Sequence, residues 1–220
     1  MRYFLGLLIC FPLLMTAQVF DDFNDGDFTN NPEWTGSVEK FIVNSNNQLQ
    51  LNDTEPGLSY LATANTMINE TEWRIWLKLS FSPSDNNNAR FYLISDRADI
   101  SEPLNGYFLQ FGEGGSDDAI ELFRQDGSSL HSVCRGTAGL LASSFEMRVK
   151  VTRDMSGNWQ VFADSDGGDN YQLECEGNDV TYTTTVFIGL YCKYTVSNST
   201  KFYFDDIYTG DIIVDNEPPI

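Results

Sequence analysis

Two aromatic segments that carry paired aspartates lie near opposite ends of the chain. VFDDFNDGDF covers residues 19–28, and FYFDDIYTG covers residues 202–210. If they are the first and last strands of one sheet, their carboxylates gather at one edge, because chain termini tend to lie close together. Ca²⁺ takes six to eight oxygen ligands, so such a group would suit one structural calcium ion. The alternative is that the aspartates cap strand ends in water.

Side-chain alternation limits which carboxylates could bind the ion. Successive residues of a strand point to opposite faces, so Asp205 and Asp206 should diverge. We therefore expect one carboxylate of each pair to contact calcium directly, and the candidates are Asp22, Asp205 and Asp206. The segment DSDGGDN, residues 164–170, also combines aspartates with glycines. A hairpin turn accounts for that composition without a metal.

Aromatic rings are the second set of candidates, since Phe, Trp and Tyr make up 14% of the chain. Sugar-binding sandwiches expose rings on which the C–H face of a sugar can stack. Alternation or an adjacent turn could leave four rings outward, and these candidate ligand-binding residues are Trp76, Tyr107, Tyr171 and Tyr194. The alternative for each ring is packing in the core or at a strand edge.

Catalytic constellations are absent from the sequence pattern. His131 is the only histidine, and its surroundings, SSLHSVCRG, do not resemble the strand–turn–helix of a nucleophile elbow. Glycoside hydrolysis needs two facing carboxyls, which the signature E-x-D-x-x-E supplies on one strand. Neither IELFRQD (120–126) nor LECEGND (173–179) fits that spacing. We therefore expect no catalytic residues.

The charge balance is strongly acidic. The chain has 32 acidic and 13 Lys and Arg residues, a formal net charge of −19. This charge repels phosphate backbones and argues against nucleic acid binding. No positively charged patch for an anionic polysaccharide is visible in the sequence. The acidity suits divalent cations and neutral ligands, although solubility alone also explains it.

Residues 1–17, MRYFLGLLICFPLLMTA, have the pattern of a secretory signal peptide. Arg2 is the positive start, residues 4–15 are apolar, and Ala17 is a small residue at a plausible cleavage point. A lipoprotein acylated at Cys10 is the alternative. Since no second long apolar run follows, we expect an exported chain without a membrane span.

Three cysteines remain after this cleavage, namely Cys134, Cys175 and Cys192. An odd number permits at most one internal disulfide, with three choices. The main interpretation is buried thiols without a function. If a bond forms, Cys175 with Cys192 is the first pair to test, because their expected strands are neighbours.

Strand patterns and turns rich in Gly, Asn and Asp recur about every ten residues. In residues 73–81 apolar side chains alternate with polar ones, and residues 146–153 show the same pattern. We expect roughly thirteen short strands, which is typical of an all-β sandwich or barrel formed by residues 18–210. The segment DIIVDNEPPI, residues 211–220, has the composition of a linker to a downstream domain.

Several segments together carry a resemblance to a known family: DDFNDGDFTNNPEWTG, RFYLISDRADISEPLNGYFLQFGE, AIELFRQDG, VKVTRDMSGNW and IGLYCKYTVSNSTKFYFDDIYTG. They resemble the N-terminal module of large secreted Bacteroidetes proteins that often carry a lamin-tail domain and a type IX sorting signal. The resemblance implies an antiparallel two-sheet jelly-roll sandwich of the concanavalin A-like (LamG-like) class. It carries over no catalytic residue, and neither a lamin-tail segment nor a sorting signal follows in this sequence.

These observations predict a secreted, non-catalytic module that binds a glycan or polysaccharide at the cell surface. A periplasmic location is a further alternative. A structural or adhesive spacer without a small ligand is the second hypothesis, and a glycoside-active enzyme is a weaker third. The binding module predicts an exposed cluster of rings beside amide and carboxylate groups, whereas the spacer predicts that every large ring is buried.

Overall fold

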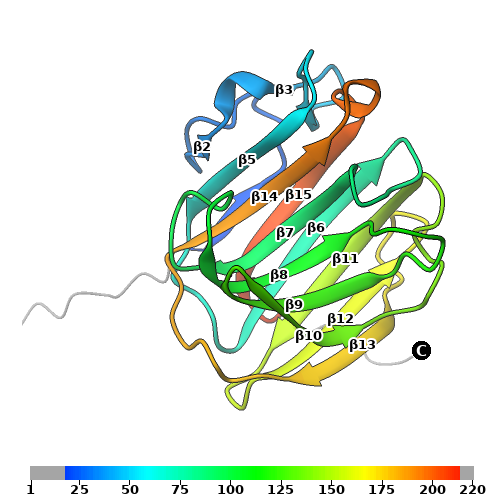
Figure 1. Ribbon diagram of the computed structural model, residues 1–220. Helices are drawn as coiled ribbons and strands as arrows, with labels where there is room; N and C mark the ends of the chain where they lie inside the picture. Colours follow the sequence, from blue (N-terminus) through cyan, green and yellow to red (C-terminus); the bar gives the residue numbers. More distant parts are fainter. Residues whose placement is uncertain (1–17, 214–220) are drawn as a thin grey trace, which may run out of the picture.

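Two antiparallel β-sheets form the molecule, whose computed structural model describes residues 18–213 (Figure 1). The eight-stranded sheet contains β1 (Val19–Asp21), β3 (Phe41–Val43), β4 (Leu49–Leu51), β6 (Thr71–Leu79), β11 (Phe145–Arg153), β12 (Asn158–Asp164), β13 (Gln172–Asn178) and β15 (Phe202–Asp211). The seven-stranded sheet contains β2 (Thr35–Gly36), β5 (Gly57–Ala64), β7 (Asn88–Ser95), β8 (Leu104–Phe111), β9 (Ile120–Gly127), β10 (Ser129–Arg135) and β14 (Phe187–Tyr194). Two short 3₁₀ turns, η1 (Val38–Lys40) and η2 (Val196–Asn198), complete the described elements.

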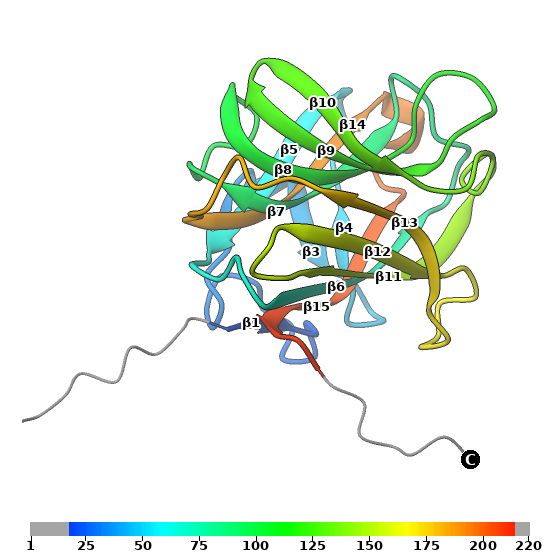
Figure 2. The same cartoon turned by 90° about the horizontal axis from the view of Figure 1, so that it is seen from below.

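The two sheets lie one over the other, as Figure 2 shows. The first runs β13-β12-β11-β6-β15-β4-β3, with β1 also paired to β15, and the second runs β10-β9-β8-β7-β14-β5-β2. Strands distant in the sequence are therefore neighbours in both sheets, as a jelly roll requires. The all-β sandwich expected from the strand pattern is confirmed.

Alternating apolar residues of each strand fill one core between the sheets. In β6 the buried set is Trp73, Ile75, Leu77 and Leu79, and in β11 it is Met147, Val149 and Val151. Trp73 stacks on Trp159 with ring centroids 5.6 Å apart. Each fully buried apolar side chain of this size contributes about 1.5–3 kcal/mol to the free energy of unfolding. The predicted inward faces of β6 and β11 are confirmed.

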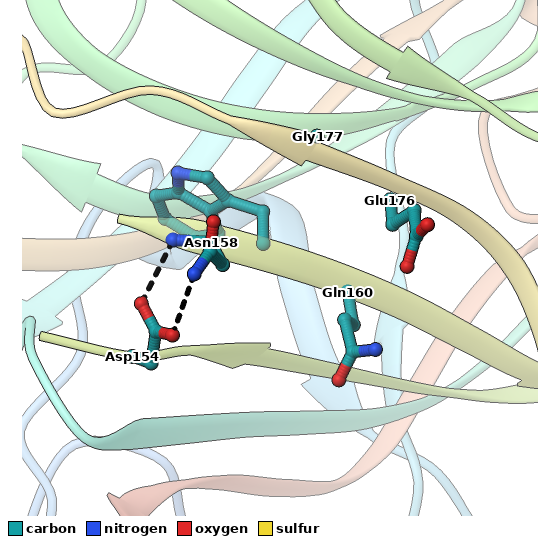
Figure 3. A pocket seen from close by; sticks show the side chains of 6 residues that line it. Asp154, Asn158, Gln160, Glu176 and Gly177 are labelled. Carbon is teal, nitrogen blue, oxygen red and sulfur yellow. Dashed lines mark hydrogen bonds between the residues drawn. The ribbon is translucent and has the colours of Figure 1, made fainter. Parts of the chain in front are cut away.

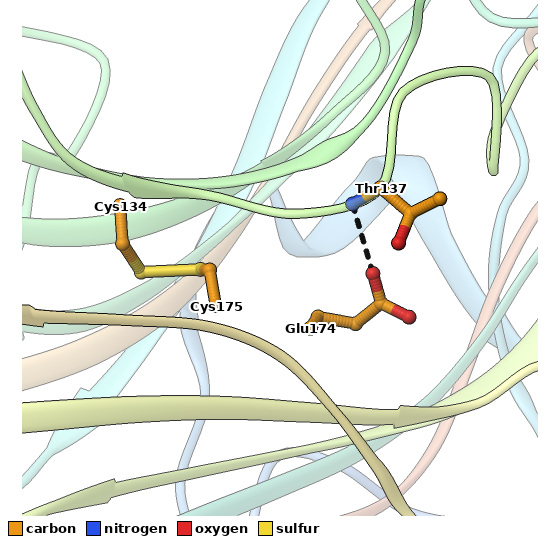
Figure 4. Close-up of a disulfide and its surroundings, with 4 residues drawn as sticks. All are labelled: Cys134, Thr137, Glu174 and Cys175. Carbon is orange, nitrogen blue, oxygen red and sulfur yellow. Dashed lines mark hydrogen bonds between the residues drawn. A yellow bond between two sulfur atoms is a disulfide. The ribbon is translucent and has the colours of Figure 1, made fainter.

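A disulfide joins the two sheets at one edge. Cys134 in β10 bonds Cys175 in β13, with their Cα atoms 5.7 Å apart (Figure 4). Close by, the Thr137 amide donates to the Glu174 carboxylate over 2.9 Å, so a second contact links the same edges. The expected pairing of Cys175 with Cys192 is wrong, because β13 is an edge strand of one sheet and β14 lies inside the other. Cys192 is a buried free thiol.

Two expectations concern segments outside the described residues. The signal peptide of residues 1–17 and most of the linker, residues 214–220, belong to these segments. Across residues 18–213 no helix is long and apolar enough to cross a membrane.

We predict that reduction of the disulfide destabilises the protein. The bridge closes a loop with a sequence separation of 41 residues, which corresponds to about 4 kcal/mol by the loop-closure entropy estimate. Guanidinium unfolding with and without dithiothreitol measures the difference. The Cys134→Ala/Cys175→Ala double variant should be insensitive to reductant, while Cys192→Ala should keep the full response. An unchanged unfolding midpoint after complete reduction of the wild type would contradict this.

Candidate functional site

The two aspartate-bearing segments do pair, as expected. Strand β1 runs antiparallel to β15, with Val19 opposite Thr209 and Asp21 opposite Ile207. Asp21 is buried and accepts hydrogen bonds from the amide of Phe23 at 3.0 Å and from Trp34 Nε1 at 2.8 Å. This pairing fastens the first strand of the sandwich to the last.

The expectation that Asp205 and Asp206 point to opposite faces is wrong. Strand β15 carries a β-bulge between Asp205 and Tyr208 where it pairs with β6, and Asp206 has a positive φ of 48°. The flanking residues Phe204 and Ile207 both enter the core. The extra residue of the bulge therefore leaves both aspartates on the outer face of the eight-stranded sheet.

Two of these carboxylates already have protein partners in the fold. Asp206 is engaged by Arg148, whose Nη2 lies 2.5 Å from its Oδ2. Asp22 accepts hydrogen bonds from Asn24, and among residues 18–213 no group of three or more His, Cys, Asp or Glu could hold a metal. Calcium requires six to eight oxygens, so calcium at Asp22, Asp205 and Asp206 stays a prediction that the described side chains do not support.

Two carboxyls near the paired termini have unusual acidity. Burial raises the pKa of Asp21 to about 6 against the hydrogen bonds from Phe23 and Trp34. Burial also raises the pKa of Asp205 to about 6, and the negative charges of Asp206 and Asp22 add to the rise. Both groups therefore favour the proton in the folded state.

The Asp205 shift predicts that this carboxyl destabilises the protein near neutral pH. A raised folded pKa means that stability is fully present below the unfolded value of 3.8 and is lost as pH rises to about 6. Asp205→Asn should therefore raise the free energy of unfolding by about 1 kcal/mol at neutral pH, after discounting for solvent screening. It should have little effect below pH 4 or so.

Urea unfolding at several pH values from about 4 to about 8 tests this. Asp117→Asn is the matched control. Asp117 is exposed, so this substitution removes the same charge from another part of the surface without changing a buried carboxyl. Equal pH profiles of the two variants would rule out the proposed role of Asp205 burial.

Two of the predicted ligand-binding rings belong to the core. Tyr107 is fully buried against Trp159, and its hydroxyl donates to Asp179. Tyr194 is buried at the other end of the sandwich, where its hydroxyl donates to Asp53 over 2.7 Å. Their expected exposure is wrong, because both occupy inward positions of their strands.

The other two rings lie on the outer face of the eight-stranded sheet. Trp76 is only 7% exposed, because the turn 164–170 folds back over it and is held by the Arg148 Nε hydrogen bond to the Gly167 carbonyl. Its expected exposure is also wrong. Tyr171 is half-buried between Arg74 and Lys150, whose charged atoms lie 6.0 and 4.8 Å from the ring centroid. Tyr171 is the one predicted ring that stays partly exposed.

A second hydrophobic cluster, separate from the core, lies on the outer face of the seven-stranded sheet. Its buried members are Tyr92, Ile100, Leu104, Phe108 and Tyr191, with Tyr60 and Phe123 packed against them. Apart from Ile100, which lies in the loop 96–103, these residues occupy the positions that alternate with core residues along β5, β7, β8, β9 and β14. The outer face of this sheet is therefore not simply a solvated polar surface.

Strand register aligns these outward side chains in rows. In one row Tyr60 on β5 is opposite Tyr191, Tyr191 is opposite Arg90 on β7, and Arg90 is opposite Gln110 on β8. The row continues to Glu121 on β9. We call the four residues Tyr60, Tyr191, Arg90 and Gln110 the central row. Two rings, a guanidinium and an amide thus come from four strands spread over the sequence.

Arg90 is held in place within the central row. Its guanidinium carbon lies 4.4 Å from the Phe108 ring centroid and 5.1 Å from that of Tyr191. Its Nε donates to Gln110 Oε1 at 3.2 Å, and its Nη1 donates to the Tyr92 hydroxyl at 3.3 Å. The Tyr92 hydroxyl in turn donates to Gln125. Such a network fixes a long flexible side chain before any ligand arrives.

The loop 96–103 covers one end of this face. Ile100 from the loop is buried against Gly189 of β14, where an added Cβ would lie only 2.7 Å from Ile100 Cδ1. A side chain at position 189 would therefore push the loop away from the sheet. The covered end explains why Tyr92 and Phe108 are buried although they face outward.

The uncovered end is a depression of about 510 Å³ beside the central row. Its lining combines a largely buried ring, two cations, a carboxylate, amides and an apolar side chain: Gly57, Leu58, Asp85, Asn88, Arg90, Gln110, Tyr191 and Lys193. We call it the outer-face pocket. Alternation within β7 and β8 could have marked Arg90 and Gln110 as outward, but the sequence does not show which strands are neighbours.

Another depression, of about 540 Å³, lies at the β12–β13 edge of the eight-stranded sheet (Figure 3). Its side chains Gln160 and Glu176 lie across from Asp154, which accepts two hydrogen bonds from Asn158. Trp159 also lines it, but that ring is fully buried in the core. Because no cation lines it, this depression offers fewer charged donors to a sugar than the outer-face pocket does.

Comparisons with known proteins identify the fold. No protein-family profile matches the sequence, and no curated protein matches it. Among solved structures, the carbohydrate recognition domain of Emp47p is 14% identical with a TM-score of 0.62, covering 89% of this chain and 95% of that one. The VIP36 exoplasmic/lumenal domain, in a Ca²⁺/Man₂-bound form, is 13% identical with a TM-score of 0.61, covering 91% and 90%.

A legume lectin-like domain from Entamoeba histolytica is also similar, at 12% identity and a TM-score of 0.59, covering 84% of this chain and 92% of that one. The chain therefore has the concanavalin A-like jelly-roll fold that the family resemblance implied, and its structural neighbours are legume lectin-like domains. Because the sequence identities are low, the likeness concerns the fold alone.

Proposed function

We propose that this protein is a non-catalytic module that binds a glycan at the outer-face pocket of its seven-stranded sheet. The observation that carries the proposal is the fixed Arg90 guanidinium lying over the rings of Phe108 and Tyr191 beside Gln110. Sugars present apolar C–H faces and many hydroxyls. A guanidinium that is held over two buried rings and beside an amide offers a planar surface and hydrogen-bond donors, which match both properties.

The likeness to lectin domains supports the proposal. The VIP36 domain is described in forms bound to Ca²⁺ with mannose-containing ligands, and the Emp47p domain is named a carbohydrate recognition domain. Other similar structures, of VIP36 and Emp46p, are metal-free forms. We keep a calcium ion as a separate proposal, since the described carboxylates of this chain do not supply its ligands.

The alternative of a spacer predicts that every large ring is buried. Tyr60, Phe123 and Tyr171 each remain partly exposed, and the first two belong to the outer-face cluster. This observation favours a binding module over a spacer. Asp85 is the one carboxylate among the residues that line the outer-face pocket, and Glu121, which continues the central row, is paired with Arg135. Glycoside hydrolysis needs two facing carboxyls, so this lining favours binding over acid–base catalysis.

We further propose that the protein acts outside the inner membrane, secreted or at the cell surface. The Cys134–Cys175 disulfide is consistent with an oxidising compartment. The resemblance of the sequence to modules of secreted Bacteroidetes proteins supports the same location.

We predict that a soluble polysaccharide raises the melting temperature, because a ligand that binds only the folded state stabilises it by mass action. A panel of neutral and acidic polysaccharides, followed by calorimetry with the best one, measures the effect. Tyr191→Ala and Gln110→Ala should each lower the affinity about tenfold, the loss of roughly one good contact.

Tyr171→Ala is the matched control, since it removes a partly exposed ring from the other sheet. It should bind as the wild type does. If no polysaccharide binds, or if Tyr171→Ala abolishes binding while Gln110→Ala does not, the proposed site is wrong.

A further inference from the structure

Most cations of this acidic protein are already paired with carboxylates. Among the twelve Lys and Arg residues of residues 18–213, seven form ion pairs. The remaining five, within this part of the chain, are Arg90, Lys150, Arg153, Lys193 and Lys201. With 32 acidic residues available, the positions of these five deserve an explanation.

Three of the five have other partners. Arg153 donates to the carbonyls of Ile68 and Tyr182 in the interior. Lys201 donates to Asn198, and Lys150 lies over aromatic rings on the eight-stranded sheet. The other two, Arg90 and Lys193, line the same outer-face pocket.

Strand register places these two cations side by side. Tyr191 is opposite Arg90 across β14 and β7, and Lys193 follows two residues later on the same face. Diagonal neighbours of this kind lie roughly 7–8 Å apart at their Cα atoms, within reach of long side chains. Both cations can therefore contact one small charged group.

Both cations keep donors that no protein group uses. Arg90 Nη2 makes no hydrogen bond within residues 18–213, and it is not among the buried unpartnered atoms, so solvent reaches it. Lys193 Nζ donates only to the backbone carbonyl of Asp85, at 2.7 Å. The Asp85 carboxylate itself lies against Gly114.

From this arrangement we infer that the glycan bound at the outer-face pocket is acidic, carrying a uronic acid carboxylate or a sulfate ester that contacts Arg90 and Lys193. This inference rests on the proposed function, because it names the chemical class of that ligand. The planar guanidinium presents parallel N–H donors that match two oxygens of a carboxylate or sulfate. Lys193 adds a point charge, while the Tyr191 ring supports the guanidinium of Arg90 from below.

The negative charge of the whole protein restricts where an acidic glycan can bind. A net charge of −19 repels polyanions over most of the surface, and repulsion is weakest where cations form no ion pair with a carboxylate. Arg135, further along the same sheet face, is paired with Glu113 and Glu121 and so offers no free charge. An acidic glycan should therefore select this pocket.

Calorimetry with matched ligand pairs tests the inference on the mature protein. Oligogalacturonate is compared with its methyl ester, and dextran sulfate is compared with dextran. We expect the charged member of at least one pair to bind at least about tenfold more tightly, as for one added charged hydrogen bond. Preference within the first pair identifies a carboxylate, and preference within the second identifies a sulfate.

Charge variants assign the effect to the pocket. Lys193→Gln and Arg90→Gln should each lower the affinity for the acidic ligand about tenfold. Lys193→Gln should lower the affinity for the acidic ligand more than the affinity for its neutral counterpart. Lys150→Gln is the matched control, because it removes an equally unpaired cation from the other sheet and should change neither affinity. Circular dichroism confirms that the variants fold.

Two outcomes would overturn the inference, and they differ in whether glycan binding itself survives. If a neutral glycan binds as tightly as its charged partner, or if Lys193→Gln leaves the preference intact, the acidic ligand is wrong while glycan binding stands. If no glycan in either pair or in the wider neutral panel binds, the proposed function fails as well.

Discussion

Every functional feature of this molecule depends on one constraint: two aligned sheets share a single core. The core takes alternate residues from each strand, including the stacked Trp73 and Trp159. The remaining residues are forced to the outer faces, where they can pack only against loops, neighbours in register or ligands. Tyr107 and Tyr194 fall on the inner side of this division, so neither is available to a ligand.

The outward side chains of the two sheets have different partners. On the eight-stranded sheet, charge dominates: Arg148 holds Asp206 and the Gly167 carbonyl, and the turn it fixes covers Trp76. On the seven-stranded sheet, a second apolar cluster has formed beneath the loop 96–103, with Arg90 lying across its open end. The loop and Arg90 bury the rings of this layer, so the guanidinium and its amide neighbour form the surface of the open end.

The paired termini and the outer-face pocket are electrostatic opposites. At the termini, burial raises the pKa of Asp205 to about 6, and the negative charges of Asp206 and Asp22 add to the rise. In the pocket, Arg90 and Lys193 lie near each other with no carboxylate partner among the described residues. The disulfide lies at the far edge of the same seven-stranded sheet, so it secures the sandwich without entering either site.

The sequence by itself determined the strand pattern and the inward faces, because a strand with one buried face has apolar residues at alternate positions. It also determined that the aspartate-bearing end segments pair. Only the tertiary structure decided the bulge that puts Asp205 and Asp206 on one face, the Cys134–Cys175 bond and the outer-face pocket. Each depends on which distant strands become neighbours and in what register, and that follows from packing of the whole chain rather than from any local pattern.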